Sequence, residues 1–187
     1  MTQRMFCGIM YPSKEGNTKM QIRIAGVEPE SIVDGPGYRF AVFVQGCPHA
    51  CPGCHNPETH DFEGGKLVDT EEIIAHLGKN PLVRGLTLSG GEPMLKAQAL
   101  LGVAKAAKAR GMNVWCYTGY TYEQLMEMND ADQMALLGLI DVLVDCPYIA
   151  AQRSLNLAFR GSGNQRLIDM NKTRETGALA LYDPEAW

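Results

Sequence analysis

FAVFVQGCPHACPGC, residues 40–54, is the stretch that decides how this sequence is interpreted. Its first part, residues 40–45, is an apolar run of strand length, and its second part is a loop that holds Cys47, Cys51 and Cys54. A disulfide scaffold spreads its cysteines along the chain, whereas three of the six cysteines crowd this one loop. The pattern therefore predicts a metal-binding loop at the C-terminal end of a strand.

The number of cysteines in the loop bears on the kind of metal. Structural zinc takes four Cys or His ligands, usually as two separated pairs, and the sequence has no second C-x2-C pair. A cluster of four irons ordinarily takes four thiolates, so three thiolates leave one iron open to another ligand. The spacing C-x3-C-x2-C favours such a cluster over zinc. Zinc is the alternative, with its fourth ligand from one of three histidines: His49, His55 and His60.

Composition excludes several classes of function. The 187 residues carry 17 Lys and Arg against 21 Asp and Glu, a formal net charge of −4, and 45% of them are hydrophobic. These values are typical of a folded domain, and the acidic balance argues against nucleic acid or an anionic membrane as a partner. No apolar stretch is long enough to span a bilayer or to form the core of a signal peptide. We therefore expect a cytoplasmic protein.

Hydrophobic periodicity predicts an alternation of strands and helices. Strands are expected at residues 20–24, 40–45, 86–88, 113–117 and 140–144. Helices are expected over residues 69–79, 96–110 and 131–138 and after residue 121, with capping boxes at Asp69/Glu72 and Thr121/Gln124. Such alternation predicts parallel strands joined by crossover helices.

The predicted fold class is α/β, a partial (open) βα barrel with mainly parallel strands. A complete eight-unit barrel usually needs about 250 residues, which is more than this chain has. We expect one domain over residues 20–187 with a short C-terminal tail, preceded by a polar leader over residues 1–19. In parallel sheets, functional residues gather at the C-terminal ends of the strands, so the loops that follow the strands are expected to form one site.

The second candidate motif is Ser89-Gly-Gly-Glu-Pro93, which follows the strand expected over residues 86–88. Two backbone amides would be exposed there, and Glu92 would stand at the rim of the site. A ligand with an amino group would suit this loop, because the carboxylate and nearby carbonyls accept protons. A plain strand-to-helix turn, with Pro93 in the first turn of the next helix, is the alternative.

Together the two motifs resemble the radical S-adenosylmethionine superfamily, whose members combine a C-x3-C-x2-C loop with a Gly-Gly-Glu-type loop on a partial βα barrel. Within it, the chain resembles the activating proteins of anaerobic (class III) ribonucleotide reductases over residues 20–170. The stretches that carry this likeness are VDGPGYR (33–39), CPGC (51–54), SGGEP (89–93), WCYTGY (115–120), VLVD (142–145) and RGSGNQ (160–165). The last is the most discriminating, because general superfamily members lack it.

The resemblance implies a reaction and its cofactors. Cys47, Cys51 and Cys54 would ligate three irons of a [4Fe–4S] cluster, and S-adenosylmethionine would chelate the fourth through its amino and carboxylate groups. Reductive cleavage would give methionine and a 5′-deoxyadenosyl radical, which takes a hydrogen atom from a glycine of the anaerobic ribonucleoside-triphosphate reductase. A low-potential donor, flavodoxin or ferredoxin, would supply the electron. No side chain is expected to act as a general acid or base.

The same resemblance assigns residues to the bound S-adenosylmethionine. Gly53 and His55 are implied on the adenosine side, and the Gly-Gly-Glu loop at the methionine amino group. Thr118 and Asp145 are further candidates at strand ends, with a strand-end turn as the alternative for Thr118. The full set of implied cofactor-binding residues is Gly53, Cys54, His55, Gly90, Gly91, Glu92, Thr118 and Asp145.

Some residues have a different expectation. Cys146 stands where the family pattern has Gly, and as a free cysteine it is expected to be a small buried filler. Cys7 and Cys116 are treated as structural or incidental. His49 and His60 are expected on the loop surface under the cluster interpretation. Arg39 and Arg160 are expected to face the reductase or a carboxylate. The alternative is that both are solvated surface charges.

Two rival functions stay open. Under the first rival function, the chain would activate another glycyl-radical enzyme such as pyruvate formate-lyase, or it would act on a small molecule to make a deazapurine. Under the second it would be a non-catalytic zinc-binding interaction module.

Overall fold

The strands and helices follow one another along residues 20–185, the part of the chain that the computed structural model describes. The strands are β1 (Gln21–Ser31), β2 (Tyr38–Val44), β3 (Lys66–Asp69), β4 (Val83–Gly90), β5 (Asn113–Tyr117), β6 (Val142–Asp145) and β7 (Arg166–Asp169). The helices are α1 (Thr70–His76), α2 (Ala97–Ala109), α3 (Tyr122–Met128), α4 (Ala131–Leu137) and α5 (Met170–Thr176). Short 3-10 turns are η1 (Pro57–Thr59), η2 (Pro93–Lys96) and η3 (Ala150–Gln152). The expected leader, with Cys7 in it, lies outside the described residues.

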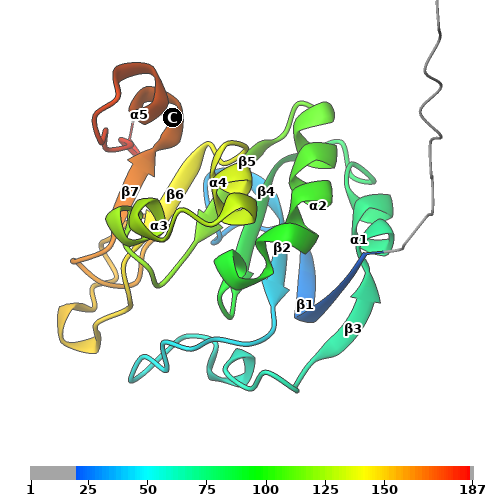
Figure 1. Cartoon of the computed structure of the whole chain (residues 1–187), viewed down its shortest axis with the longest axis horizontal. Coiled ribbons are helices and arrows are strands. Elements are labelled where there is room, and N and C mark those ends of the chain that lie inside the picture. Colours follow the sequence, from blue (N-terminus) through cyan, green and yellow to red (C-terminus); the bar gives the residue numbers. More distant parts are fainter. Residues whose placement is uncertain (1–19, 186–187) are drawn as a thin grey trace, which may run out of the picture.

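One seven-stranded mixed sheet organises these elements, in the order β3-β1-β2-β4-β5-β6-β7 (Figure 1). The pairs β2–β4, β4–β5 and β5–β6 are parallel, while β1–β2, β1–β3 and β6–β7 are antiparallel. The α/β class is thus confirmed, but the expectation of mainly parallel strands is wrong at both edges of the sheet. Between β1 and β2 the connection is too short for the crossover that a parallel pair requires.

Helices cover one face of the sheet. Figure 1 shows α1, α2 and α4 gathered on one side of the strands, with α5 beside β7. Leu100, Val103, Ala104 and Ala107 of α2 are fully buried, a spacing that forms one apolar stripe. They belong to the same cluster as inward residues of the strands, such as Leu86. Each large side chain buried in this way contributes about 1.5–3 kcal/mol.

The opposite face has a smaller apolar cluster, which holds the last strands together. Trp115, Val144 and Leu167 are buried there, with Phe159 packed against Trp115 in an edge-on contact at 5.5 Å between ring centroids. Phe159 comes from the long loop between β6 and β7, so this loop covers part of the face that has no helix.

Helix starts were predicted with mixed success. The capping box at Thr121 and Gln124 is confirmed, because each residue's side chain accepts a hydrogen bond from the other's backbone amide. The one expected at Asp69 is wrong, because its side chain makes no capping hydrogen bond. Asp69 ends the unpredicted strand β3, and its carboxylate accepts a hydrogen bond from Gln21 on β1 at 3.2 Å.

Arg39 lies inside the protein and ties three parallel strands together near their N-terminal ends. Its Nε donates to Thr87 Oγ1 at 2.6 Å on β4, and Nη1 donates to Asn113 Oδ1 at 2.7 Å on β5. The guanidinium lies 5.3 Å from the ring centroid of Trp115, a cation–π distance. Burial lowers the pKa of Arg39 to about 10. The expectation that Arg39 faces a partner or solvent is therefore wrong.

Arg39→Met should lower the free energy of unfolding by at least about 2 kcal/mol, because it leaves buried acceptors without donors. Urea unfolding followed by circular dichroism measures this effect. The control is Arg84→Met, since Arg84 lies on β4 but is exposed. Equal unfolding free energies for the two variants would show that Arg39 does not hold the strands.

Candidate functional site

A cavity of about 690 Å³ lies at the C-terminal ends of the parallel strands. The loops after β2, β4 and β5 line it, together with Cys146 and most of the residues from 153 to 161 in the loop before β7. In Figure 1 the loops that follow β2, β4 and β6 lie along the lower edge of the sheet. The expectation that these loops meet is confirmed. The predicted residues that line the cavity are Cys47, Cys51, Cys54, His55, Gly90, Gly91 and Thr118.

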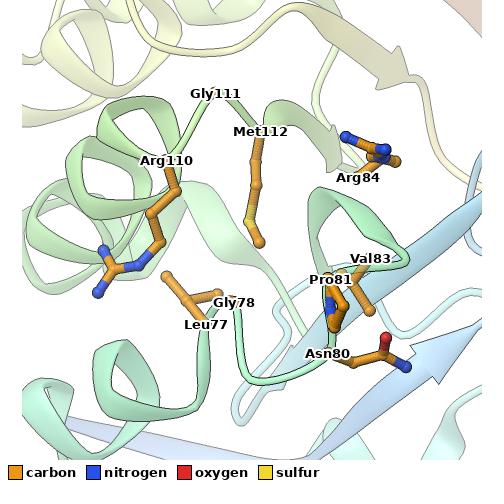
Figure 2. Close-up of a pocket in the computed structure, with 9 residues that line it drawn as sticks. All are labelled: Leu77, Gly78, Asn80, Pro81, Val83, Arg84, Arg110, Gly111 and Met112. Atoms are coloured by element: carbon orange, nitrogen blue, oxygen red, sulfur yellow. The ribbon is translucent and has the colours of Figure 1, made fainter.

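A second, smaller hollow of about 380 Å³ lies at the other end of the strands, between the loops α1–β4 and α2–β5. Figure 2 shows the side chain of Met112 pointing into it between Arg110 and Arg84. Arg110 donates to the carbonyl of Ala106 in its own helix, and Asn80 donates to Glu30. This hollow contains none of the predicted site residues, so we assign the site to the larger cavity.

The cysteine loop presents three free, half-buried thiols to the larger cavity. Burial raises the pKa of the Cys47 thiol, and hydrogen bonds from the backbone amides of His49 and Ala50 oppose that shift. Cys54 Sγ accepts a hydrogen bond from the amide of Asn56 at 3.4 Å. Amides directed at sulfur stabilise thiolates, which are the form that binds metal.

This donor set fits a [4Fe–4S] cluster better than a zinc ion. Structural zinc takes four Cys or His ligands, whereas three thiolates leave one iron of a four-iron cluster open to another ligand. The loop offers three free thiols, and they stand beside a cavity that has space for a further ligand.

The Gly-Gly-Glu loop packs directly against the beginning of the cysteine loop. The amide of Gly91 donates to Val44 O at 2.8 Å, and the amide of Glu92 donates to Gly46 O at 2.9 Å. A Cβ on Gly91 would stand 2.4 Å from Gly46 O, so only glycine permits this approach. The expectation of two exposed amides is therefore wrong for Gly91 and Glu92, because both join the two loops.

The Glu92 carboxylate is buried with no exposed surface, so its expected place at the rim is wrong. Oε1 accepts hydrogen bonds from Thr118 Oγ1 at 2.8 Å and from the amide of Met94 at 3.0 Å. Oε2 accepts one from the amide of Gly119 at 2.9 Å and lies 2.7 Å from His49 Nε2. Buried carboxylates persist only when paired in this way. The side chain therefore joins the loops rather than lining the cavity.

Asp145 is also buried and is not among the residues that line the cavity. Its Oδ2 accepts a hydrogen bond from the amide of Tyr122 at 2.8 Å, and its Oδ1 accepts one from Arg166 Nε at 3.0 Å. Arg166 also donates to Glu123, and this hydrogen bond lowers the pKa of Glu123 to about 2. Asp145 thus anchors α3 and β7 to the end of β6.

The RGSGNQ segment, residues 160–165, forms a hydrogen-bonded turn in the cavity wall. Gln165 Oε1 accepts from the amides of Gly161 and Ser162 at 2.8 and 3.1 Å, and Gln165 O accepts from Arg160 Nη1 at 2.9 Å. Among the described residues, the buried Nε of Arg160 has no hydrogen-bond partner. Arg160 is half-buried and lines the cavity, so it is not a solvated surface charge.

Comparison with known proteins gives the family. Residues 33–168 match the family model described as a 4Fe-4S single cluster domain. The chain is 39% identical to the anaerobic ribonucleoside-triphosphate reductase-activating protein of Haemophilus influenzae and 41% identical to that of Vibrio cholerae, over 145 residues each. Both matches cover 73% of this chain and 91% of the relative, and the Escherichia coli K12 protein is 37% identical with 92% covered. The chain belongs to the family of anaerobic ribonucleoside-triphosphate reductase-activating proteins.

Cys146 has the backbone conformation of a glycine. Cys146 has φ +76°, in the left-handed region that glycine adopts without strain. It is half-buried and lines the cavity, so the expectation of a buried filler is wrong. Burial raises the pKa of its thiol to about 11, unlike that of a reactive cysteine.

Several residues at the cavity were not predicted to contact a cofactor. His49 was expected on the loop surface, yet it contacts Glu92 and packs edge-on against Tyr120. Gly53, expected on the adenosine side of the ligand, has φ +73° and is not among the residues that line the cavity. Further residues that do line it are Ser89, Tyr117, Tyr148, Arg153 and Gln165.

Gly91→Ala should lower the free energy of unfolding by about 1–3 kcal/mol, because the new Cβ would push the two loops apart. It should also reduce the iron bound after anaerobic reconstitution. Urea unfolding and iron analysis measure both effects. Gly26→Ala is the matched control, since a Cβ there meets no atom within 4 Å. A G91A protein that resembles G26A in both measurements would contradict the close packing of the loops.

Proposed function

We propose that this chain activates an anaerobic ribonucleoside-triphosphate reductase by generating a glycyl radical on it. The observation that carries this function is the meeting of the three-cysteine loop with the Gly-Gly-Glu loop in one cavity. Its relatives that share 37–41% identity are named as activating proteins of that reductase. The 4Fe-4S domain match and the cysteine donor set support a [4Fe–4S] cluster with S-adenosylmethionine as the cofactors.

Cys47, Cys51 and Cys54 would hold the cluster. When bound, the cluster and S-adenosylmethionine supply the one-electron chemistry that removes a hydrogen atom from the target glycine. The protein's own residues bind and orient the cofactors and keep solvent away. We assign the backbone at Gly90 and Gly91, which lines the cavity, to the methionine end of S-adenosylmethionine.

We assign the adenosine end to the wall formed by His55 and Tyr148. Their rings lie 4.8 Å apart between centroids, and both residues line the cavity. Aromatic rings offer a flat apolar surface on which a purine can stack. Gly53 lies behind this wall, because a Cβ on it would be 3.7 Å from the Tyr148 ring. Arg160, which also lines the cavity, provides a cation for a carboxylate.

Glu92, Thr118 and Asp145 have supporting roles in this proposal rather than direct contacts to S-adenosylmethionine. Thr118 lines the cavity, but its hydroxyl donates to Glu92. Asp145 holds α3 and β7, as described above. Glu92 and Asp145 therefore support the cavity from outside its lining, and Thr118 lines the cavity while its hydroxyl is engaged by Glu92.

The parallel strands β2, β4, β5 and β6, with the cavity at their C-terminal ends, support an open radical S-adenosylmethionine barrel. A single domain over residues 20–187 belongs to the same proposal. The electron donor would be flavodoxin or ferredoxin, and the compartment the cytoplasm. Of the helices in the described part of the chain, none combines the length and apolar character needed to span a membrane.

The mouth of the cavity suits a polypeptide target. Val33 and Leu155 line the cavity, yet 74% and 89% of their surfaces are exposed. Exposed apolar side chains at the rim of a site indicate a surface that another molecule covers. In this proposal, that molecule is the glycine-bearing segment of the reductase.

Leu155→Asp should lower the yield of glycyl radical on the reductase at least about fivefold and leave reductive cleavage of S-adenosylmethionine unchanged. Electron paramagnetic resonance measures the radical, and chromatography of 5′-deoxyadenosine measures cleavage. Leu181→Asp is the matched control, because Leu181 is 63% exposed and does not line the cavity. A full radical yield with L155D would exclude the mouth as the docking surface.

Cys51→Ser should abolish the cluster and with it the glycyl radical, whereas Cys146→Gly should retain both. Iron and sulfide analysis after anaerobic reconstitution measures the cluster in each variant. Electron paramagnetic resonance with the reductase present then measures the glycyl radical. Radical formation by C51S would contradict the function. If wild-type protein cleaves S-adenosylmethionine but leaves the reductase without a radical, the target is another glycyl-radical enzyme.

A further inference from the structure

We propose, on the basis of the function proposed above, that His49 is a positioning residue. Through Glu92, it holds the cysteine loop at a fixed place relative to the Gly-Gly loop. It would thereby set how the cluster and S-adenosylmethionine meet, although it binds neither.

The ring of His49 is confined by three neighbours. Its Nε2 lies 2.7 Å from Glu92 Oε2, and its side chain is only 17% exposed. Tyr120 packs edge-on against it, with 4.6 Å between ring centroids. Gly119 lies underneath, where a Cβ would stand 2.3 Å from His49 Cδ2 and 2.6 Å from Nε2. Only a glycine at position 119 allows the ring to occupy this place.

Glu92 is held in place by hydrogen bonds to residues outside the cysteine loop. Its other three partners are Met94, in the turn η2 after β4, and Thr118 and Gly119, directly after β5. Among the described residues, His49 is the one side chain of the cysteine loop that reaches this carboxylate. The contact therefore joins the loop that carries the thiols to the strand ends that frame the cavity.

Because of its position in the cysteine loop, His49 can fix the backbone between two of the thiols. The backbone hydrogen bonds between the two loops end at Gly46, before Cys47. His49 lies between Cys47 and Cys51, so its side chain fixes the part of the loop between two thiols. Ala50, the next residue, has φ +45°, a left-handed conformation that a non-glycine residue keeps only when its surroundings enforce it. The His49–Glu92 contact is a neighbouring constraint of that kind.

His49→Ala would release this part of the loop without removing a thiol. We expect S-adenosylmethionine to bind about tenfold more weakly, with iron content unchanged. The probe is S-adenosylmethionine titrated anaerobically into dithionite-reduced protein, and the readout is the change in the cluster's resonance spectrum. His76→Ala is the control for loss of a histidine, because His76 is exposed at the end of α1. His49→Gln, which keeps a donor, should recover part of the affinity.

Gly119→Ala should also release this part of the cysteine loop, because the new Cβ takes the space of the His49 ring. It should weaken binding by a similar factor in the wild-type background. In the H49A background that space is empty, so the same substitution should have little further effect. Such non-additivity distinguishes a shared contact from two separate structural lesions.

Each outcome decides the proposal. Weakened binding in H49A and G119A, with a non-additive double variant, is the expected result. Equal titrations for H49A and H76A would overturn it, as would additive effects in the double variant. Loss of iron from H49A would also overturn it, because His49 would then be a metal ligand. If wild-type protein itself shows no spectral change with S-adenosylmethionine, the proposed function fails instead.

Discussion

The buried carboxylate of Glu92 is the constraint on which the site depends. An unpaired charge at a fully buried position would cost several kcal/mol, so the fold must bring donors to both oxygens. The donors come from three segments: the turn after β4, the end of β5 and the cysteine loop after β2. Satisfying one side chain therefore brings the cysteine loop and the Gly-Gly loop to the same place.

A second buried charge acts at the other end of the same strands. Arg39 joins β2, β4 and β5 near their N-terminal ends, while Glu92 joins the segments that follow these strands. Parallel strands are not connected by hairpins, so their relative placement depends on such long-range contacts. Close backbone approaches complete the arrangement, because Gly85 makes room for the Arg39 guanidinium and Gly91 for Gly46. The parallel core is thereby fixed at both ends and supports a site at one of them.

The sequence predicted the positions of the central elements and the meeting of the functional loops well. β5 spans the predicted residues 113–117, and α2 agrees with its predicted range within a residue at each end, because strong periodicity determines both. The edge strands β3 and β7 were missed, since four-residue strands carry little periodic signal. The directions of polar side chains were the main error. Glu92, Asp145 and Arg39 have the residue types of a site, but tertiary contacts turn all three inward, and a sequence pattern contains no information on those contacts.

The central claim is that the cysteine loop and the Gly-Gly loop together place S-adenosylmethionine on an open iron of a [4Fe–4S] cluster. Electron–nuclear double resonance of the reduced protein, with S-adenosylmethionine carrying ¹⁵N at its amino group, tests this most directly. The account predicts a ¹⁵N hyperfine coupling to the cluster that is absent with unlabelled ligand. A reduced cluster whose spectrum shows no coupling to that nitrogen would contradict it.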